Sequence, residues 1–228
     1  MPSGLKSWIA DAARSRQIDL RAEAEFGLPS RLLMERAGLA VFGAMREVLP
    51  GSGRVAVLAG KGNNGGDGFV VARLAREAGY GVECLCAALE SELSSESAEQ
   101  AAIARAQGLT ILFRDDARYE RRLDNLASRD LLVDALLGTG AEGETRGAIR
   151  EAIQAINRSG VPVLSIDVPS GVHTDTGEEL GESVWALRTV VLGMPKPFLF
   201  QGIGIEHSGY WDVREIGLPP ALTEEPTR

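Results

Sequence analysis

The stretch Gly60-Lys61-Gly62-Asn63-Asn64-Gly65-Gly66-Asp67-Gly68 decides how this chain folds. An apolar run, Val55 to Leu58, precedes it, and a helical pattern, Phe69 to Ala78, follows it. A strand, a tight glycine-rich turn and a helix place backbone N–H groups at a helix N-terminus, where they face an anion. The five glycines allow positive φ and leave room for a ligand against the backbone. We therefore expect this loop to bind a phosphate.

The polar side chains of the loop extend this expectation. Asn63, Asn64 and Asp67 supply amide and carboxylate groups, in place of the Lys-Ser/Thr pair of a Walker loop. Such groups suit a polar ring or a cation next to the phosphate. Asn-Gly and Asp-Gly pairs are also common in plain turns. Two Asn, one Asp and five Gly between a strand and a helix favour a binding loop over a plain turn.

Composition restricts the class of protein. The chain has 228 residues, of which 44% are hydrophobic and 25% charged, as in ordinary globular proteins. Its net charge of −8 argues against nucleic-acid binding. Cys84 and Cys86 share one face of a predicted strand, so we expect free thiols and a reducing compartment. No apolar run is long enough to span a bilayer and no signal-peptide core is present, so we expect a cytoplasmic protein without a membrane partner.

Hydrophobic patterns predict one domain over residues 1–228, with N-terminal helices within 8–49 and a flexible tail at 219–228. Gly27-Leu28-Pro29 separates two N-terminal helices, and Ser30 is expected to cap the second. Further helices are expected at Ser91–Ala106, Tyr119–Ala127 and Ile149–Ile156. The expected strands are Val55–Leu58, Val82–Cys86, Leu109–Phe113, Leu131–Leu137, Val161–Ile166, Ala186–Leu192 and Tyr210–Ile216.

Strands that are apolar throughout and alternate with helices predict an α/β fold with a parallel sheet covered on both faces. Ligands of such sheets bind beyond the carboxyl ends of the strands. Four polar clusters follow strand ends and should converge there. They are the first glycine-rich loop, Asp134 with a second loop at Gly138–Glu144, Asp167 with Ser170, and Lys196.

Each cluster also has a plain structural explanation. One acid at a strand end is as often a locally paired structural group as a functional one, but Asp134 and Asp167 together favour a shared site. Asn64, Asp134 and Ser170 would form an all-oxygen ligand set, which suits a hard cation rather than zinc. Lysines are usually exposed, whereas the flanking prolines of Lys196 favour contact with a ligand.

Three motifs and two flanking stretches resemble the NAD(P)H-hydrate epimerase family, also called the YjeF N-terminal domain family. The motifs are Gly60–Gly68, Val133-Asp134-Ala135-Leu136-Leu137-Gly138-Thr139-Gly140 and Ile166-Asp167-Val168-Pro169-Ser170-Gly171. The flanking stretches are Gly27-Leu28-Pro29 with Leu33–Gly38, and Val213–Pro219. The resemblance implies a Rossmann-like three-layer α/β/α sandwich with a mostly parallel central sheet, and a homodimer.

The resemblance also implies an isomerase that epimerises the R and S forms of hydrated NADH and NADPH, with one K⁺ per subunit. It would supply the S form to a separate or fused NAD(P)H-hydrate dehydratase. Asn64, Asp134 and Ser170 would contact the potassium ion. Lys196 departs from the family pattern, because Pro197 stands where glycine usually follows. The substrate would contact Asn63, Asn64, Gly65, Gly66, Asp67, Gly138, Thr139, Gly140, Ala141, Glu142, Gly143, Glu144 and Asp167.

The expected chemistry starts at carbon 6 of the substrate ring, which carries the hydroxyl. An acid protonates that hydroxyl, water leaves, and water returns to the opposite face of the planar cation. Asp167 is the expected acid and base, with Asp67 as the alternative, and Lys196 would orient the water. Opening of the ring to an aldehyde is equally consistent with the sequence. A non-catalytic nucleotide- or protein-binding module of the same fold is the alternative to an enzyme.

Overall fold

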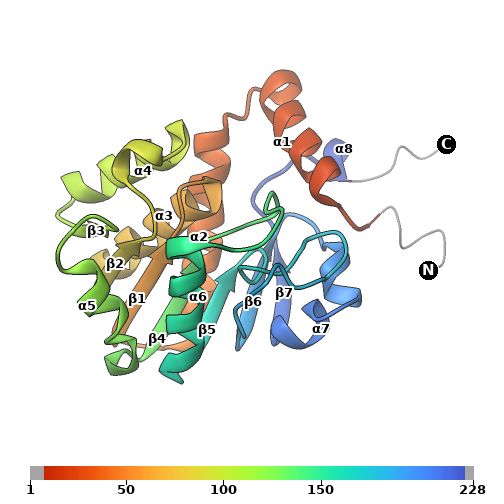
Figure 1. Cartoon of the computed structure of the whole chain (residues 1–228). Coiled ribbons are helices and arrows are strands. Elements are labelled where there is room, and N and C mark those ends of the chain that lie inside the picture. The colour runs from red at the N-terminus through yellow and green to blue at the C-terminus, as the bar shows by residue number, and fades with distance from the viewer. Residues whose placement is uncertain (1–7, 224–228) are drawn as a thin grey trace.

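Seven strands form one sheet in the computed structural model, which describes residues 8–223 (Figure 1). The strand order is β3-β2-β1-β4-β5-β6-β7, and every neighbouring pair is parallel. The strands are β1 (Arg54–Ala59), β2 (Gly81–Cys86), β3 (Ile111–Phe113), β4 (Leu131–Ala135), β5 (Val163–Ile166), β6 (Arg188–Leu192) and β7 (Tyr210–Arg214). The predicted α/β fold and its seven strands are confirmed.

Helices cover both faces of this sheet (Figure 1). The longer helices are α1 (Ala12–Phe26), α2 (Ser30–Val48), α3 (Asn63–Glu77), α4 (Ser95–Ala106) and α6 (Gly147–Ser159). The shorter ones are α5 (Tyr119–Leu123), α7 (Gly204–His207) and α8 (Pro220–Thr223), with 3-10 turns at Glu90–Glu92, Leu126–Ser128 and Pro197–Phe200.

Alternating side chains of the strands divide the core into two apolar layers. Val55 and Val57 of β1 pack with residues of α2, α3 and α4 on one face. Ala56 and Leu58 of the same strand pack with α5 and α6 on the other face. Both layers are apolar because a central parallel strand has no solvated face. This is the three-layer sandwich that the sequence predicted.

The sheet reverses its strand order at β1, which pairs with β2 on one side and with β4 on the other. Chain connections therefore leave the carboxyl ends of β1 and β4 in opposite directions. A crevice forms at such a switch point, and ligands of open α/β sheets bind there. The first glycine-rich loop follows β1 and the second follows β4, so both loops border this crevice.

The glycines of the first loop have a different role from the one predicted. Helix α3 begins at Asn63, so most of the loop is helical, and none of the five glycines has a positive φ. A Cβ on Gly65 would lie 2.0 Å from the Gly60 carbonyl oxygen, and one on Gly66 would lie 2.5 Å from the Met34 sulfur. These glycines allow α3 to approach its neighbours closely, whereas a Cβ on Gly62 would meet nothing within 4 Å.

Two further expectations need correction. The predicted flexible tail at 219–228 is wrong for its first part, because Pro220–Thr223 forms α8 and Leu222 packs against Ile18 and Ala22 of α1; residues 224–228 lie outside the described range. Ser30 is the first residue of α2, and Pro29 occupies the capping position, where it makes no side-chain hydrogen bond.

Several predicted element bounds also shift. β4 ends at Ala135, two residues before the predicted end, and β3, β5, β6 and β7 are likewise shorter than predicted. The predicted helix over Tyr119–Ala127 divides into α5 and a 3-10 turn. Cys84 and Cys86 are free and buried, as expected. Between residues 8 and 223, no helix has the length and apolar character needed to cross a membrane.

Replacing Gly65 by alanine should destabilise the fold by ~1–3 kcal/mol, because its Cβ would overlap backbone atoms that have no room to move. Gly43→Ala is the matched control on α2, where a Cβ meets nothing within 4 Å. Alanine is the better helix former there by about 1 kcal/mol, so Gly43→Ala should stabilise slightly. Urea unfolding of both variants measures the difference, and equal stability of the two would contradict the packing role of Gly65.

Candidate active site

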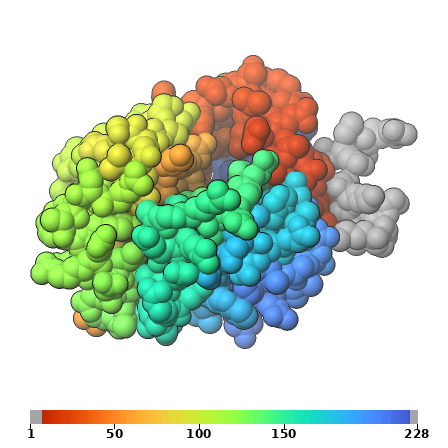
Figure 2. Space-filling view, in the orientation of Figure 1, coloured from red at the N-terminus to blue at the C-terminus, as the bar shows by residue number. Residues whose placement is uncertain are grey.

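One large cavity, of about 760 Å³, opens at the carboxyl edge of the sheet (Figure 2). Its walls come from α1 and α2, the start of α3, the loop after β4, and the segments that follow β5 and β6. Figure 2 shows the hollow between the N-terminal residues, in red, and the green segment that follows β4. The volume is sufficient for a nucleotide-sized ligand.

Nine of the predicted site residues line this cavity: Asn63, Asn64, Asp67, Gly138, Thr139, Gly140, Ala141, Asp167 and Lys196. Gly65 and Gly66 lie within the protein next to α3 and are not among the lining residues. Glu142, Gly143 and Glu144 are exposed outside the cavity, and Glu144 lies 3.6 Å from Arg146. The first half of the second loop therefore faces the cavity, and the second half faces solvent.

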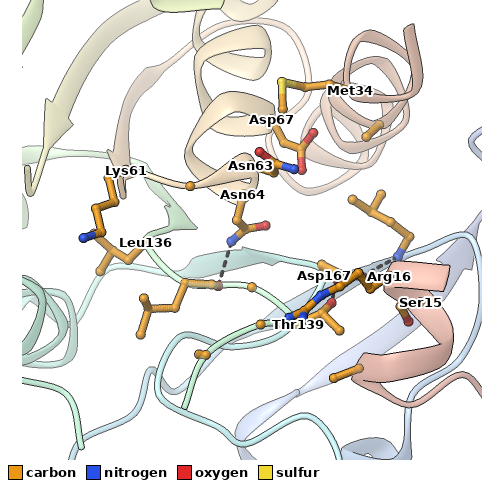
Figure 3. A pocket seen from close by; sticks show the side chains of 18 of the residues that line it. Ser15, Arg16, Met34, Lys61, Asn63, Asn64, Asp67, Leu136, Thr139 and Asp167 are labelled. Atoms are coloured by element: carbon orange, nitrogen blue, oxygen red, sulfur yellow. Dashed lines mark hydrogen bonds between the residues drawn. The ribbon is translucent and has the colours of Figure 1, made fainter. Parts of the chain in front are cut away.

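Asp167 has the most constrained backbone in the site. Its φ of 67° is the only positive value for a non-glycine residue in the part of the chain described. Such a conformation costs about 1–3 kcal/mol and usually persists where function requires it. Its carboxylate accepts hydrogen bonds from the Thr139 hydroxyl at 2.5 Å and from the Leu192 amide at 3.0 Å. The carboxylate is thereby fixed against the cavity wall (Figure 3).

Lys196 forms an ion pair with Asp167 inside the cavity. Its ammonium nitrogen lies 2.6 Å from Asp167 Oδ1, and only 3% of the residue is exposed. The ammonium also donates to the carbonyl oxygens of Leu192 and Met194, at 3.0 and 3.3 Å. Lys196 therefore lines the cavity, and its contact with a ligand stays a prediction.

Asp67 is a second buried carboxyl in the same cavity. It projects from α3 and is 8% exposed. Burial raises its pKa well above the usual range, and the negative charges of Asp167 and Asp19 raise it further. A raised pKa favours the protonated form of the carboxyl group, which can donate a hydrogen bond.

Asp19 is a cavity residue that the sequence interpretation missed. It lies on α1 and lines the cavity. The residue is exposed to the open cavity, and partial removal from bulk water raises its pKa to about 6; Asp167 adds to this shift, and Lys196 opposes it. In the sequence, Asp19 follows the buried Ile18 on an amphipathic helix, but nothing indicates that this helix lies over the sheet edge. Ser15 and Arg16 of the same helix also line the cavity (Figure 3).

The three predicted cation ligands meet beneath the cavity, around the backbone of Leu137. Ser170 accepts a hydrogen bond from the Leu137 amide at 2.8 Å, and the Asn64 amide donates to the Leu137 carbonyl at 2.7 Å. Asp134 is fully buried and accepts hydrogen bonds from the hydroxyls of Ser170, at 2.5 Å, and Ser165, at 2.8 Å. Carboxylate, hydroxyl, amide and carbonyl oxygens are thus together, and this donor set fits a hard monovalent cation.

The cavity has a cationic side away from the carboxyl groups. Lys61 and Arg114 line it there, together with the acidic Glu92, which lies 3.4 Å from Arg114. Figure 3 shows Lys61 on the opposite side of the view from Asp167 and Arg16. The cavity therefore offers basic groups to phosphates at one side and proton-carrying groups at the other.

These features define an α/β domain with a loop-lined cavity at the switch point of a parallel sheet, which is where such folds bind their ligands. The model of the family described as YjeF-related protein N-terminus matches residues 30–198, and the chain belongs to this family. The NAD(P)H-hydrate epimerase of Pirellula staleyi is 38% identical to it, over 95% of this chain and 96% of that protein.

Two other similar proteins are a longer relative and a protein of known structure. The bifunctional NAD(P)H-hydrate repair enzyme of Thermofilum pendens is 36% identical over 95% of this chain, which spans only 41% of that longer protein. The crystal structure of yeast ynu0 superposes with a TM-score of 0.75 at 26% identity, covering 83% of this chain and 82% of that one. The family thus includes proteins of about this length and longer, two-activity proteins.

The raised pKa of Asp19 makes a prediction about stability. A carboxyl group whose pKa is higher in the folded than in the unfolded chain stabilises the fold at low pH, and this contribution is lost as pH rises from about 4 through about 6. Asn does not titrate, so the free energy of unfolding of Asp19→Asn, relative to the unaltered chain, should increase across that range. Urea unfolding at several pH values measures it. A relative stability that stays constant or decreases would contradict the shift.

Proposed function

We propose that this chain epimerises the R and S forms of hydrated NADH and NADPH, and so takes part in nicotinamide nucleotide repair. The carrying observation is the strained, ion-paired Asp167 in a nucleotide-sized cavity at the sheet's switch point. Relatives with nearly the same length as this chain, such as that of Pirellula staleyi, are named NAD(P)H-hydrate epimerases. Both the names of these relatives and the acid–base groups of the cavity therefore support an epimerase.

The reaction inverts carbon 6 of the hydrated ring. Protonation of the carbon 6 hydroxyl lets it leave as water while the ring nitrogen donates electrons, and carbon 6 becomes planar. Water then adds to the opposite face and loses a proton. Asp167 serves as acid and base, since it reaches the cavity and is held by Thr139 and Lys196. Lys196 fixes its direction and orients water.

The remaining lining groups bind the dinucleotide. Asp67 forms a hydrogen bond to the substrate from the start of α3. The amides at the start of α3 and of the second loop suit the pyrophosphate. Lys61 and Arg114, on the opposite side of the cavity, suit further phosphate groups. The cation ligands lie next to the second loop, so a bound ion would keep that loop in its binding conformation.

K⁺ is the proposed cofactor, one per subunit, held by Asn64, Asp134 and Ser170 near the Leu137 carbonyl. Its chemistry there is electrostatic, because a monovalent cation adjacent to the second loop attracts the phosphates of the substrate. The functional partner is an NAD(P)H-hydrate dehydratase that consumes the S form, as the bifunctional relatives suggest.

A homodimer and a cytoplasmic location belong to the same proposal. Trp185, Tyr210 and Trp211 are exposed near β7, at the edge of the sheet, and would be covered in a dimer. Light scattering of the purified chain measures the mass. The free, buried Cys84 and Cys86 are compatible with a reducing compartment.

Turnover separates the enzyme from a binding module. The R hydrate, incubated with catalytic amounts of the chain, should reach the R/S equilibrium faster than it does spontaneously, as followed by chromatography of the two forms. Binding of the hydrate without acceleration would instead support the non-catalytic module.

Replacing Asp167 by Asn should lower the epimerisation rate about 10²–10⁴-fold with little change in affinity, because Asn cannot carry the proton. Asp67→Asn should act mainly on affinity, since Asn still donates a hydrogen bond but differs from the carboxyl group in shape and charge. Single-turnover rates and equilibrium binding, measured separately, distinguish the two effects. Normal turnover by Asp167→Asn would remove it as acid and base, and a pure rate loss in Asp67→Asn would transfer the role to that residue.

Potassium should raise the melting temperature and the rate more than lithium at equal ionic strength, because a ligand that binds only the folded state stabilises it. Ser170→Ala should reduce this preference for potassium. Thermal unfolding and initial rates in KCl and LiCl provide the measurement. If neither salt nor the Ser170 change alters the two quantities, the assigned ligand set is wrong.

A further inference from the structure

Inversion of a carbon through a planar intermediate uses both faces of the ring. The departing water leaves from one face and the incoming water arrives at the other. A single carboxyl group on one wall of the cavity reaches only one of these two positions well, because proton transfer needs a separation of roughly 2.6–3.2 Å. The proposed function therefore calls for a second acid–base group on another wall.

Asp19 meets this requirement by position. It lines the cavity from α1, whereas Asp167 lines it from the carboxyl end of β5. Figure 3 shows Ser15 and Arg16, on the same helix as Asp19, bordering the part of the cavity that contains Thr139 and Asp167. Within residues 8–223 the Asp19 carboxyl makes no ion pair or hydrogen bond, whereas Asp167 is held by Lys196 and Thr139. Its proton is free to be exchanged with a ligand.

The helix that carries Asp19 is held firmly over the cavity. The Ala12 amide donates to Asp175 at 2.8 Å and the Ala10 amide to the Pro195 carbonyl at 2.9 Å, so the start of α1 is tied to two other segments. Ile18 and Ala22 pack against Leu222 of α8. These contacts fix the height of the helix above the sheet edge and, with it, the position of the Asp19 carboxyl.

The charges around Asp19 suit proton exchange near neutrality. Asp167 and Lys196 face it from the ends of β5 and β6, Asp67 faces it from α3, and Arg16 precedes it on α1. Partial removal from bulk water raises its pKa to about 6, Asp167 adds to this shift, and Lys196 opposes it. A group with a pKa close to the working pH is the most effective general acid or base.

We propose that Asp19 is a second catalytic residue of the epimerisation and acts on the ring face opposite to Asp167; this role rests on the proposed function. In one direction the Asp19 carboxyl group protonates the carbon 6 hydroxyl, the carbon–oxygen bond breaks, and water leaves. The ring nitrogen supplies the electron pair that forms the carbon–nitrogen double bond. Water adds to the other face, returns that electron pair to nitrogen, and gives its proton to Asp167.

In the reverse direction Asp167 donates and Asp19 accepts. Each turnover therefore moves one proton from one carboxyl group to the other, and exchange with cavity water restores the starting state. No oxidant, reductant or co-substrate is needed. The site also assists electrostatically, since Asp19, once it has given up its proton, and Asp167 are carboxylates around a ring that becomes cationic in the intermediate.

The test compares Asp19→Asn, Asp19→Glu and the unaltered chain with the R hydrate of NADH between pH 5 and 8. Asp19→Asn should lower kcat about 10²-fold or more, with KM changed less than about threefold, because the lost interaction forms in the transition state. The change of kcat with pH near pH 6, which reports the titration of Asp19, should be absent in Asp19→Asn. Asp19→Glu, which restores a carboxyl group, should recover part of the rate and this change with pH. Glu23→Gln is the matched control, because Glu23 is exposed on the same helix outside the cavity.

The outcomes separate the role of Asp19 from the proposed function. If the unaltered chain does not accelerate epimerisation, the function is rejected, and the role of Asp19 with it. If the unaltered chain is active and Asp19→Asn retains its kcat and its pH profile, only the role of Asp19 is rejected. If Asp19→Asn and Asp19→Glu raise KM equally and leave kcat unchanged, Asp19 is a binding group, and the proposal is again overturned. Melting temperatures show whether each variant is folded in the assay.

Discussion

The buried carboxylate of Asp134 is the interaction on which the site depends. It lies next to the last residue of β4, is fully buried, and accepts hydrogen bonds from Ser165 on β5 and from both the amide and the hydroxyl of Ser170. A buried charge of this kind is tolerated only when its oxygen atoms are satisfied. The two loops that follow β4 and β5 are thereby held together, and the hydroxyl of Ser170 in turn positions the Leu137 amide. This hydrogen-bond network therefore holds the floor of the cavity in place.

Above that floor, the site is electrostatically unusual for its size. Three carboxyl groups, Asp19, Asp67 and Asp167, share a cavity with one buried lysine. Lys196 pairs directly with Asp167, while burial and like charges raise the pKa values of the other two. Carboxyl groups with perturbed pKa values that share one cavity are typical of sites of acid–base catalysis. The same arrangement would be costly in a protein that only bound a nucleotide, and this supports an enzyme over a binding module.

The sequence was most informative where local pattern and fold coincide. Apolar runs predicted all seven strands, and the rule that strand ends share one edge brought Asn64, Asp134, Asp167 and Lys196 together correctly. The sequence did not predict features that depend on packing between segments far apart in the chain. The glycines after β1 fit against Gly60 and Met34, which no local pattern indicates.

The same limit explains the missed residues. Helix α8 forms because Leu222 finds an apolar partner on α1, about 200 residues earlier in the chain. Asp19 enters the site because α1 is tied to Asp175 and Pro195. The positive φ of Asp167 is fixed by its hydrogen bonds to Thr139 and Leu192, and the residue type alone does not require it. Each of these features joins segments that are far apart in sequence.

The most direct measurement of the central claim is a crystal structure of the chain with hydrated NADPH bound. Carbon 6 of the ring should lie beside Asp167 and Lys196, with the carbon 6 hydroxyl at a hydrogen-bond distance of about 2.6–3.2 Å from a carboxyl oxygen. The phosphates should lie toward the start of α3 and Lys61. A ring bound at the Lys61 side, with the adenine next to Asp167, would contradict the account.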